Sequence, residues 1–272
     1  MANYLPIVKA LESTNISVRG LGQVVVDPAT IEVGNNSVVA RCRVAGVRGY
    51  KMIKCYHTSQ HRCDVDGVSY YPKSLRIYGF SGRVEYADVA ISKWVGGVAL
   101  DIIFYRGGCD FRVLSRAFDA MAYKHLKKGV IHGDIKPENI IVMPSGKMTL
   151  VDNDQLPTDG IGNIQAKDYG SELYTHRYRQ MRRTDEHTDH YALAIISAFL
   201  AALIYDSTFL SDNATMDEYI GRVTEILSAN NDTAHYNMIV AMQRSIMGKV
   251  EGIEELFQSI VVANEKIVVI VV

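Results

Sequence analysis

The hydrophobic pattern of this chain changes near Gly97, and this change does most to restrict the folds open to it. Before Gly97, short segments rich in β-branched and aromatic residues are separated by Gly, Asn and Ser, which predicts strands. After Gly97, apolar residues recur at the spacing of amphipathic helices. The sequence therefore predicts a strand-rich part followed by a helical part, which is the α+β class.

Each predicted segment has a local pattern of its own. Ser81-Gly82 separates the last two strands and predicts a tight hairpin turn, and Gly129 is placed to end the first long helix. The predicted strands are 24–26, 37–44, 50–56, 74–80 and 83–94. The predicted helices are 111–128, one that begins near Tyr191, 215–228, 233–247 and 251–262.

Composition sets limits on partners and location. The 272 residues are 48% apolar and 22% charged with a net charge of −1, so we expect a soluble globular protein and no nucleic-acid partner. The longest apolar run, 191–205, is shorter than the roughly 20 residues of a membrane span, so a buried core helix is predicted. Residues 1–6 lack the layout of a signal peptide, and we expect a cytoplasmic location.

The four cysteines do not form a disulfide framework of the kind expected in small secreted proteins. Cys55, His57, His61 and Cys63 are zinc-ligand types in one short segment. Their spacing matches no common zinc module, which favours unrelated core and surface residues over a structural zinc site.

The segment 131–139 contains the residue types needed for phosphoryl transfer. It places Asp134, Lys136 and Asn139 within six positions, and Asp152 follows an apolar, strand-like run eighteen residues after Asp134. A carboxylate can orient a hydroxyl, a lysine can neutralise a moving phosphate, and an amide and a second carboxylate can hold magnesium. This combination predicts a phosphotransfer site.

The loop resembles the catalytic loop of the protein kinase superfamily, with Gly133 where the commonest version has Arg. The run from Lys136 to Asn139 is similar to the eukaryotic-like serine/threonine branch, whereas the His-Gly-Asp opening also occurs in small-molecule kinases. The resemblance implies a two-lobed protein-kinase-like fold. Its parts would be a small antiparallel β lobe at 1–91, a hinge at 92–97 and a larger helical lobe at 98–266.

The resemblance also implies a role for each residue of the loop. Asp134 would orient the substrate hydroxyl, and Lys136 would neutralise the γ-phosphoryl group. Asn139 and Asp152 would bind Mg2+. His132 and Asp189 would support the loop, with Asp189 bracing its backbone through amide hydrogen bonds.

The first part of the chain would supply the ATP-binding residues. Lys54 matches the lysine for the α- and β-phosphates, and Val39 precedes it by fifteen residues. Gly34 is the remaining glycine of the phosphate loop. Ile91 would be the gatekeeper, with Ser92 and Trp94 in the hinge.

Several positions depart from the family pattern. Asn153 and Asp154 replace the usual Phe and Gly after the metal-binding aspartate, and segment 170–179 lacks Ala-Pro-Glu. No glutamate occupies the usual position for pairing with Lys54. The acidic candidates in its place are Asp64, Asp66 and Glu85.

The residues 267–272 are all Ile or Val, and we predict a strand that pairs with a sheet edge or a partner chain. For the whole chain we expect an ATP- and Mg2+-dependent phosphotransferase, a serine/threonine protein kinase. The alternatives are a small-molecule kinase of the same superfamily and a pseudokinase interaction module. The substrate would be a protein or small-molecule hydroxyl.

Overall fold

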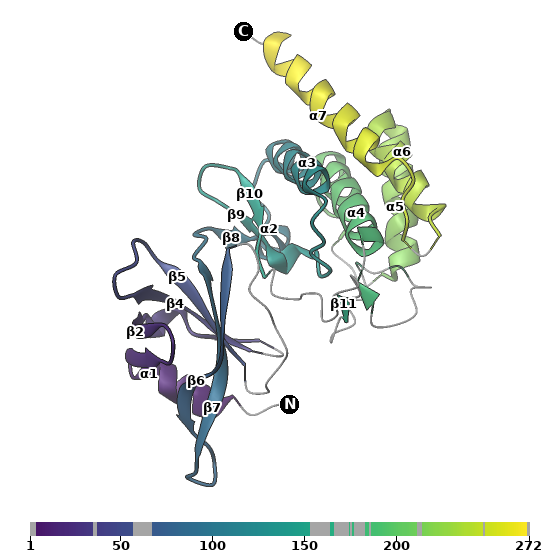
Figure 1. Ribbon diagram of the computed structural model, residues 1–272. Coiled ribbons are helices and arrows are strands. Elements are labelled where there is room, and N and C mark those ends of the chain that lie inside the picture. The colour runs from purple at the N-terminus through teal and green to yellow at the C-terminus, as the bar shows by residue number, and fades with distance from the viewer. Residues whose placement is uncertain are drawn as a thin grey trace. The chain divides into compact units, whose positions relative to one another are not determined.

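The structure is a computed structural model, and it divides the chain into two compact units, 1–95 and 96–272 (Figure 1). The boundary falls inside the segment predicted as a hinge. Each unit has a separate hydrophobic core. The described residues are 4–34, 37–56, 67–152, 164–165, 174, 176, 183–184, 186–210, 214–246 and 248–270.

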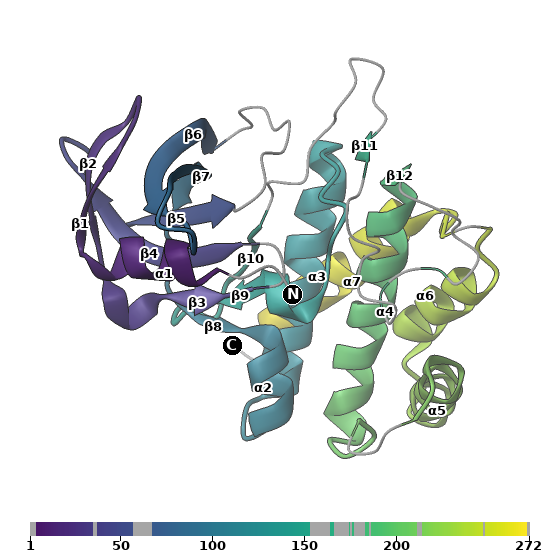
Figure 2. The same cartoon turned by 90° about the horizontal axis from the view of Figure 1, so that it is seen from below.

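The first unit is a closed antiparallel barrel of six strands. The order around it is β2-β1-β6-β7-β5-β4, and β2 pairs with β4 to close it (Figure 2). The short β3 (Glu32–Val33) pairs with β4. The barrel strands are β1 (Asn15–Val18), β2 (Gly22–Val26), β4 (Val38–Val44), β5 (Lys51–Tyr56), β6 (Val68–Tyr78) and β7 (Val84–Lys93).

The closed barrel shows that the predicted two-lobed protein-kinase-like fold with a small antiparallel β lobe is wrong. In the barrel, Val24 lies opposite Val44 and Val26 lies opposite Cys42, so β2 and β4 are not left as sheet edges. The sequence analysis missed β1, which pairs with both β2 and β6. Because β1 lies between β2 and β6, the predicted strands without β1 could not form the closed barrel.

Alternating side chains fill the barrel. Val24, Ala40, Ile53 and Val89 are fully buried in its core, while their neighbours in sequence point to the other face of each strand. Helix α1 (Leu5–Glu12), also missed, adds Ile7 and Leu11 to this core. A short 3-10 helix, η1 (Pro28–Thr30), joins β2 to β3.

The second unit is mainly helical. Helix α3 (Phe111–Lys128) has the predicted bounds, with Asp110 as its N-cap and Gly129 in the left-handed conformation after it. Thr215 and Glu218 form a capping box at the start of α5. The other helices are α2 (Leu100–Arg106), α4 (Glu186–Tyr205), α5 (Met216–Ala229), α6 (Thr233–Gln243) and α7 (Ile253–Ile270).

Two small sheets complete the second unit. One has the order β10-β9-β8 and the other pairs β11 with β12. Their strands are β8 (Val98–Ala99), β9 (Ile140–Val142), β10 (Met148–Leu150), β11 (Ile164–Gln165) and β12 (Arg183–Thr184).

Helix α4 is the central helix of the second core. Its 20 residues have a mean hydropathy of 1.4, so by length and composition alone it could cross a membrane, but 83% of the apolar window is buried within the protein. Leu193, Ile195 and Ile196 are fully buried. The prediction of a buried core helix here is confirmed.

The predicted C-terminal strand at 267–272 is wrong for residues 267–270. They continue α7, whose long helix is labelled at the C-terminal end of Figure 1. Residues 253–262 already have helical spacing, and extending a helix by one more residue adds one hydrogen bond without a new nucleus. Residues 271–272 lie outside the described residues.

Candidate active site

Local geometry places the loop 131–139 between α3 and β9. Gly133 has φ 80°, a left-handed backbone conformation that favours glycine. The 3-10 helix η2 (Pro137–Asn139) then leads into β9. Since Leu150 lies opposite Ile140 and the Val151 N–H donates to the Asn139 carbonyl at 2.9 Å, Asp152 follows directly beside this loop.

Asp134 is the centre of the polar contacts in the loop. Its Oδ2 lies 2.9 Å from Lys136 Nζ and 3.0 Å from Asn139 Nδ2. Asn139 Nδ2 also donates to the Asp134 carbonyl at 2.8 Å. Asp134 and Asn139 are buried, and the loop therefore holds a carboxylate, a cation and an amide in one cluster.

Asp189 on α4 braces the backbone of the loop. Its carboxylate accepts hydrogen bonds from the N–H of His132 at 2.7 Å and of Gly133 at 2.8 Å. These are the amide hydrogen bonds predicted for Asp189. His125 on α3 adds a contact from Nε2 to Asp189 at 2.9 Å, and the sequence analysis missed this histidine. Its position in the last turn of α3, close to the loop, was the available signal.

His132 links the loop to the end of β10. Its Nε2 lies 2.8 Å from the Val151 carbonyl, and its Nδ1 lies 3.3 Å from the Asp134 N–H. A carbonyl only accepts and an N–H only donates, so the neutral ring protonated at Nε2 satisfies both contacts. Burial lowers the pKa of His132, which keeps the ring in this neutral form.

Asn139 and Asp152 fit the hard-oxygen preference of Mg2+. Because Asn139 uses its amide nitrogen on Asp134, its Oδ1 is the atom that remains for a metal. Asp152 has φ 68°, a left-handed conformation that Asp tolerates better than most residues. Magnesium is commonly held by one or two such protein oxygens together with phosphates and water.

The predicted ATP-binding residues of the first unit lie on the barrel. Lys54 and Val39 are directly opposite each other on β5 and β4. Ile53 and Cys55 belong to the barrel core, so Lys54 lies on the outer face. Lys54 is 8% exposed, and its Nζ lies 5.6 Å from the centre of the Tyr56 ring.

Ile91 was predicted to line the nucleotide site, but its side chain belongs to the barrel core. The alternation of β7 instead puts Ala90 and Ser92 on the outer face with Lys54, and Ala90 lies opposite Lys54. The prediction for Ile91 is therefore wrong, because a shift of one residue along a strand reverses the face.

Glu85 does not suit the role of partner to Lys54. It lies opposite Ile77, five residues along β7 from Ala90, or about 17 Å of strand. Asp88, which the sequence analysis did not weigh, is on the same face as Lys54. It accepts hydrogen bonds from the Tyr70 hydroxyl and from the Lys73 N–H at the bulge in β6, which is a structural role.

Gly34 and Trp94 lie at opposite ends of the strands. The Gly34 N–H donates to the Ser37 carbonyl at 2.9 Å across the β3–β4 hairpin. The Trp94 N–H donates to the Tyr50 carbonyl at 3.3 Å, and the Trp94 ring lies 5.9 Å from the Arg41 guanidinium.

Several predicted residues lie outside the described part of the chain. They are Asp64 and Asp66, the zinc candidates His57, His61 and Cys63, the positions Asn153 and Asp154, and 170–179 except Tyr174 and His176. Cys55 itself is fully buried in the barrel core.

A buried polar cluster joins three helices of the second unit. Asp119 on α3 accepts from the Ser197 hydroxyl at 2.6 Å and lies 3.3 Å from His235 Nε2. His235 Nδ1 also lies 2.9 Å from Asp232. Burial alone would lower the pKa of His235, but the two carboxylates outweigh it and raise the pKa to about 10. An acid on the apolar face of 111–128 was the sequence signal for this cluster.

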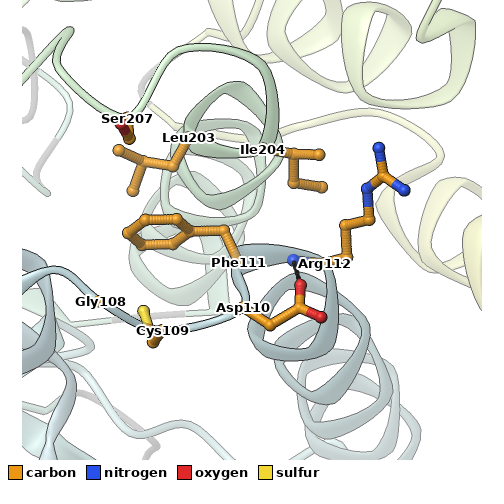
Figure 3. A pocket seen from close by; sticks show the side chains of 8 residues that line it. All are labelled: Gly108, Cys109, Asp110, Phe111, Arg112, Leu203, Ile204 and Ser207. Carbon is orange, nitrogen blue, oxygen red and sulfur yellow. Dashed lines mark hydrogen bonds between the residues drawn. The ribbon is translucent and has the colours of Figure 1, made fainter.

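An open pocket of about 350 Å³ lies where the start of α3 meets the end of α4 (Figure 3). It contains none of the predicted site residues. Its lining residues are Gly108, Cys109, Asp110, Phe111, Arg112, Leu203, Ile204 and Ser207. Asp110 is already bound to the Arg112 N–H at 2.9 Å, as an N-cap.

Comparison with known proteins gives a partial similarity to a kinase. A stretch of 88 residues is 34% identical to the serine/threonine-protein kinase CHK1 of Saccharomyces cerevisiae. It covers 31% of this chain, and the chain spans 17% of the length of that protein. No family model matches the chain. The comparisons therefore support a relationship to a protein kinase over part of the chain and do not extend to an activity.

Proposed function

We propose that this protein is an ATP- and Mg2+-dependent phosphotransferase that transfers the γ-phosphate to a serine or threonine hydroxyl of a protein. The observation that carries the proposal is the cluster in which Lys136 and Asn139 both contact Oδ2 of Asp134. Phosphoryl transfer depends on positioning and charge neutralisation, which this cluster supplies. The partial similarity to a serine/threonine kinase supports the same chemistry.

In this proposal each residue of the loop has one task. Asp134 accepts a hydrogen bond from the substrate hydroxyl and takes its proton, and Lys136 stabilises negative charge on the transferred group. Asp189 and His132 keep the loop backbone in place through the contacts at 2.7 to 2.8 Å. These contacts hold the start of the loop, and the hydrogen bond from the Val151 N–H to the Asn139 carbonyl at 2.9 Å holds its end. A loop held at both ends does not need to reorganise during the reaction.

Asn139 and Asp152 would hold Mg2+, which supplies charge neutralisation of the phosphates when bound. On the barrel, Lys54 is the proposed contact for nucleotide phosphates, with Val39 opposite it on β4 and Ala90 opposite it on β7. Gly34, Ser92 and Trp94 would complete the nucleotide-binding set. This set is a proposal for the outer face of the barrel.

The second candidate is a small-molecule kinase, and the His-Gly-Asp sequence at 132–134 favours it. It uses the same residues and the same nucleotide, and it differs only in the acceptor. The two candidates therefore make the same prediction for every loop variant and different predictions for substrates.

A transfer assay with γ-labelled ATP and Mg2+ tests the proposal. We expect label on generic protein substrates, with a rate at least about 100-fold lower for Asp134→Asn because a positioned base contributes about that factor. Asp152→Asn should lose both transfer and the Mg2+-dependent part of nucleotide binding. Glu225→Gln, at an exposed carboxylate on α5, is the matched control and should behave as the parent.

The substrate panel and a thermal-shift measurement complete the experiment. Label on metabolites alone would favour the small-molecule kinase. Two results would contradict a phosphotransferase and support an interaction module. One is that the parent and Asp134→Asn transfer the same amount of label to substrate, and the other is that ATP and Mg2+ do not shift the melting temperature of the protein.

A further inference from the structure

The two units carry opposite charge, which the net charge of the whole chain conceals. Residues 1–95 contain 12 Lys and Arg against 7 Asp and Glu, a net charge of +5. Residues 96–272 contain 17 Lys and Arg against 23 Asp and Glu, a net charge of −6. An excess of positive charge on one compact unit favours anionic partners of that unit.

Much of the positive charge collects at one end of the barrel, where β4 ends, β5 begins and β7 ends. We name this surface the basic rim. Of its residues, Arg41, Arg43, Tyr50 and Trp94 occupy outward-facing positions of this end, Arg48 lies in the connection between β4 and β5, and Lys51 and Lys93 occupy the terminal inward-facing positions of β5 and β7. About 13 Å of strand β5 separates Tyr50 from Lys54.

The aromatic and guanidinium groups of the basic rim lie against one another. The Arg41 guanidinium is 4.7 Å from the centre of the Tyr50 ring and 5.9 Å from that of Trp94. The Arg43 guanidinium is 4.6 Å from the Tyr50 ring and donates to its hydroxyl at 2.8 Å. Tyr50 is nevertheless 42% exposed. The result is a solvent-facing set of planar groups held in place by cation–π contacts.

The remaining cations of the basic rim are poorly compensated. Lys51 and Lys93 lie directly opposite each other on β5 and β7, an arrangement of like charges that destabilises a sheet unless an anion is present. Asp27 pairs with Arg41. Within the described residues, no carboxylate lies at ion-pair distance from Arg43, Arg48, Lys51 or Lys93. Bound phosphates would relieve this repulsion.

We propose that the basic rim binds single-stranded nucleic acid. The cations contact backbone phosphates, and the rings and guanidinium planes of Tyr50, Trp94 and Arg41 stack on unpaired bases. This surface goes beyond the phosphotransferase proposal. It shares Trp94 with the proposed nucleotide-binding set, and the variants that test it leave Trp94 unchanged. A polyanion without bases, such as an acidic peptide, would use the charges of the basic rim but not its planar groups.

Fluorescence anisotropy of the full chain with labelled 15-nucleotide dT and U strands at low salt tests this inference. Arg43→Glu, Arg48→Glu and Lys93→Glu together should weaken binding at least tenfold and reduce the slope of log affinity against log salt by about 2. Lys124→Glu, Lys128→Glu and Arg244→Glu reverse three exposed cations of the other unit and are the matched control. The control should bind within twofold of the parent.

Tyr50→Leu separates stacking from charge. It should weaken binding of the oligonucleotides about tenfold, as expected for the loss of one stacked base, and leave binding of a poly-glutamate peptide unchanged. Asp134→Asn should bind the strands as the parent does, so a failed kinase assay does not affect this result. Circular dichroism establishes that each variant is folded.

Three results would overturn the inference. The first is no binding of either strand at low salt. The second is an equal loss in the basic-rim variant and its control, which would indicate unspecific charge attraction. The third is that poly-glutamate binds as tightly as the oligonucleotides and that Tyr50→Leu changes the affinity for neither ligand. This result would indicate an acidic protein partner.

Discussion

At the scale of single residues, the second unit uses buried carboxylates in two different ways. Asp134 is the centre of a cluster within one loop, with Lys136 and Asn139 as near neighbours in sequence. Asp119 is fully buried and contacts His235, 116 residues away. The first arrangement brings a carboxylate, a cation and an amide together within the loop 131–139. The second joins α3 to α6 inside the core, where an unpaired charge would be costly.

His235 gives a prediction about pH. Its pKa is about 10 in the folded protein and about 6.5 when unfolded, so its stabilising effect is complete below pH 6.5 and is lost as the pH rises toward 10. His235→Gln should lower the free energy of unfolding by about 3–5 kcal/mol near pH 6.5. The difference from the parent should shrink at pH 9.5, as measured by urea unfolding.

The matched control for this measurement is His187→Gln, at a partly exposed histidine on α4. It should produce a small difference from the parent. A stability difference for His235→Gln that stays constant from pH 6.5 to 9.5 would contradict the raised pKa and the charged form of His235 in the core.

At the scale of elements, the end of α3 decides where the loop begins. Gly129 takes a left-handed conformation with φ 62°, its N–H donates to the Leu126 carbonyl at 3.0 Å, and the chain then turns into 131–139. Asp189 on α4 and the Val151 carbonyl after β10 then hold the first residues of the loop, Gly133 and His132. The elements α3, α4 and β10 therefore determine the position of Asp134, although the candidate functional residues themselves belong to the loop.

Two glycine variants test the role of the helix end. Gly129→Ala should destabilise the protein by about 1 kcal/mol, since an alanine is strained in the left-handed region. Gly221→Ala, in the interior of α5 where an added Cβ would meet no atom within 4 Å, should stabilise by about 0.5–1 kcal/mol. Urea unfolding at pH 7 measures both, and destabilisation of similar size by both variants would contradict this account.

At the scale of the molecule, the chain contains two cores that share no residue. One is inside the barrel with α1, and the other is built around α4. The two units also differ in the sign of their charge. The sign of the net charge and the hydrophobic cores therefore both distinguish residues 1–95 from residues 96–272.

Separate cores predict separate unfolding transitions. Ile77→Ala in the barrel and Leu193→Ala in α4 should each cost about 2–5 kcal/mol, because both side chains are buried and leave cavities. Scanning calorimetry of the full chain should show that each variant lowers a different transition. A single transition lowered equally by both variants would contradict independent units.

How much the sequence predicts depends on the distance between contacting residues. The contacts of Asp134 with Lys136 and Asn139 span at most five positions, and the cap at Gly129 is a local signal. The amide hydrogen bonds of Asp189 span 56 and 57 positions and were expected only through the kinase resemblance. His125, Asp119 and His235 were missed because their contacts span 64 to 116 positions.

The sequence by itself determined where most helices and strands form and which loop collects the carboxylate, the lysine and the amide, since these depend on periodicity and short-range spacing. Only the tertiary structure decided that β2 pairs with β4 to close a barrel, that Ile91 faces inward while Ala90 and Ser92 face outward, and that positive charge gathers at one end of the barrel. The physical reason is that strand pairing and register join residues far apart in the chain, and a change of one position in register reverses the face of every side chain.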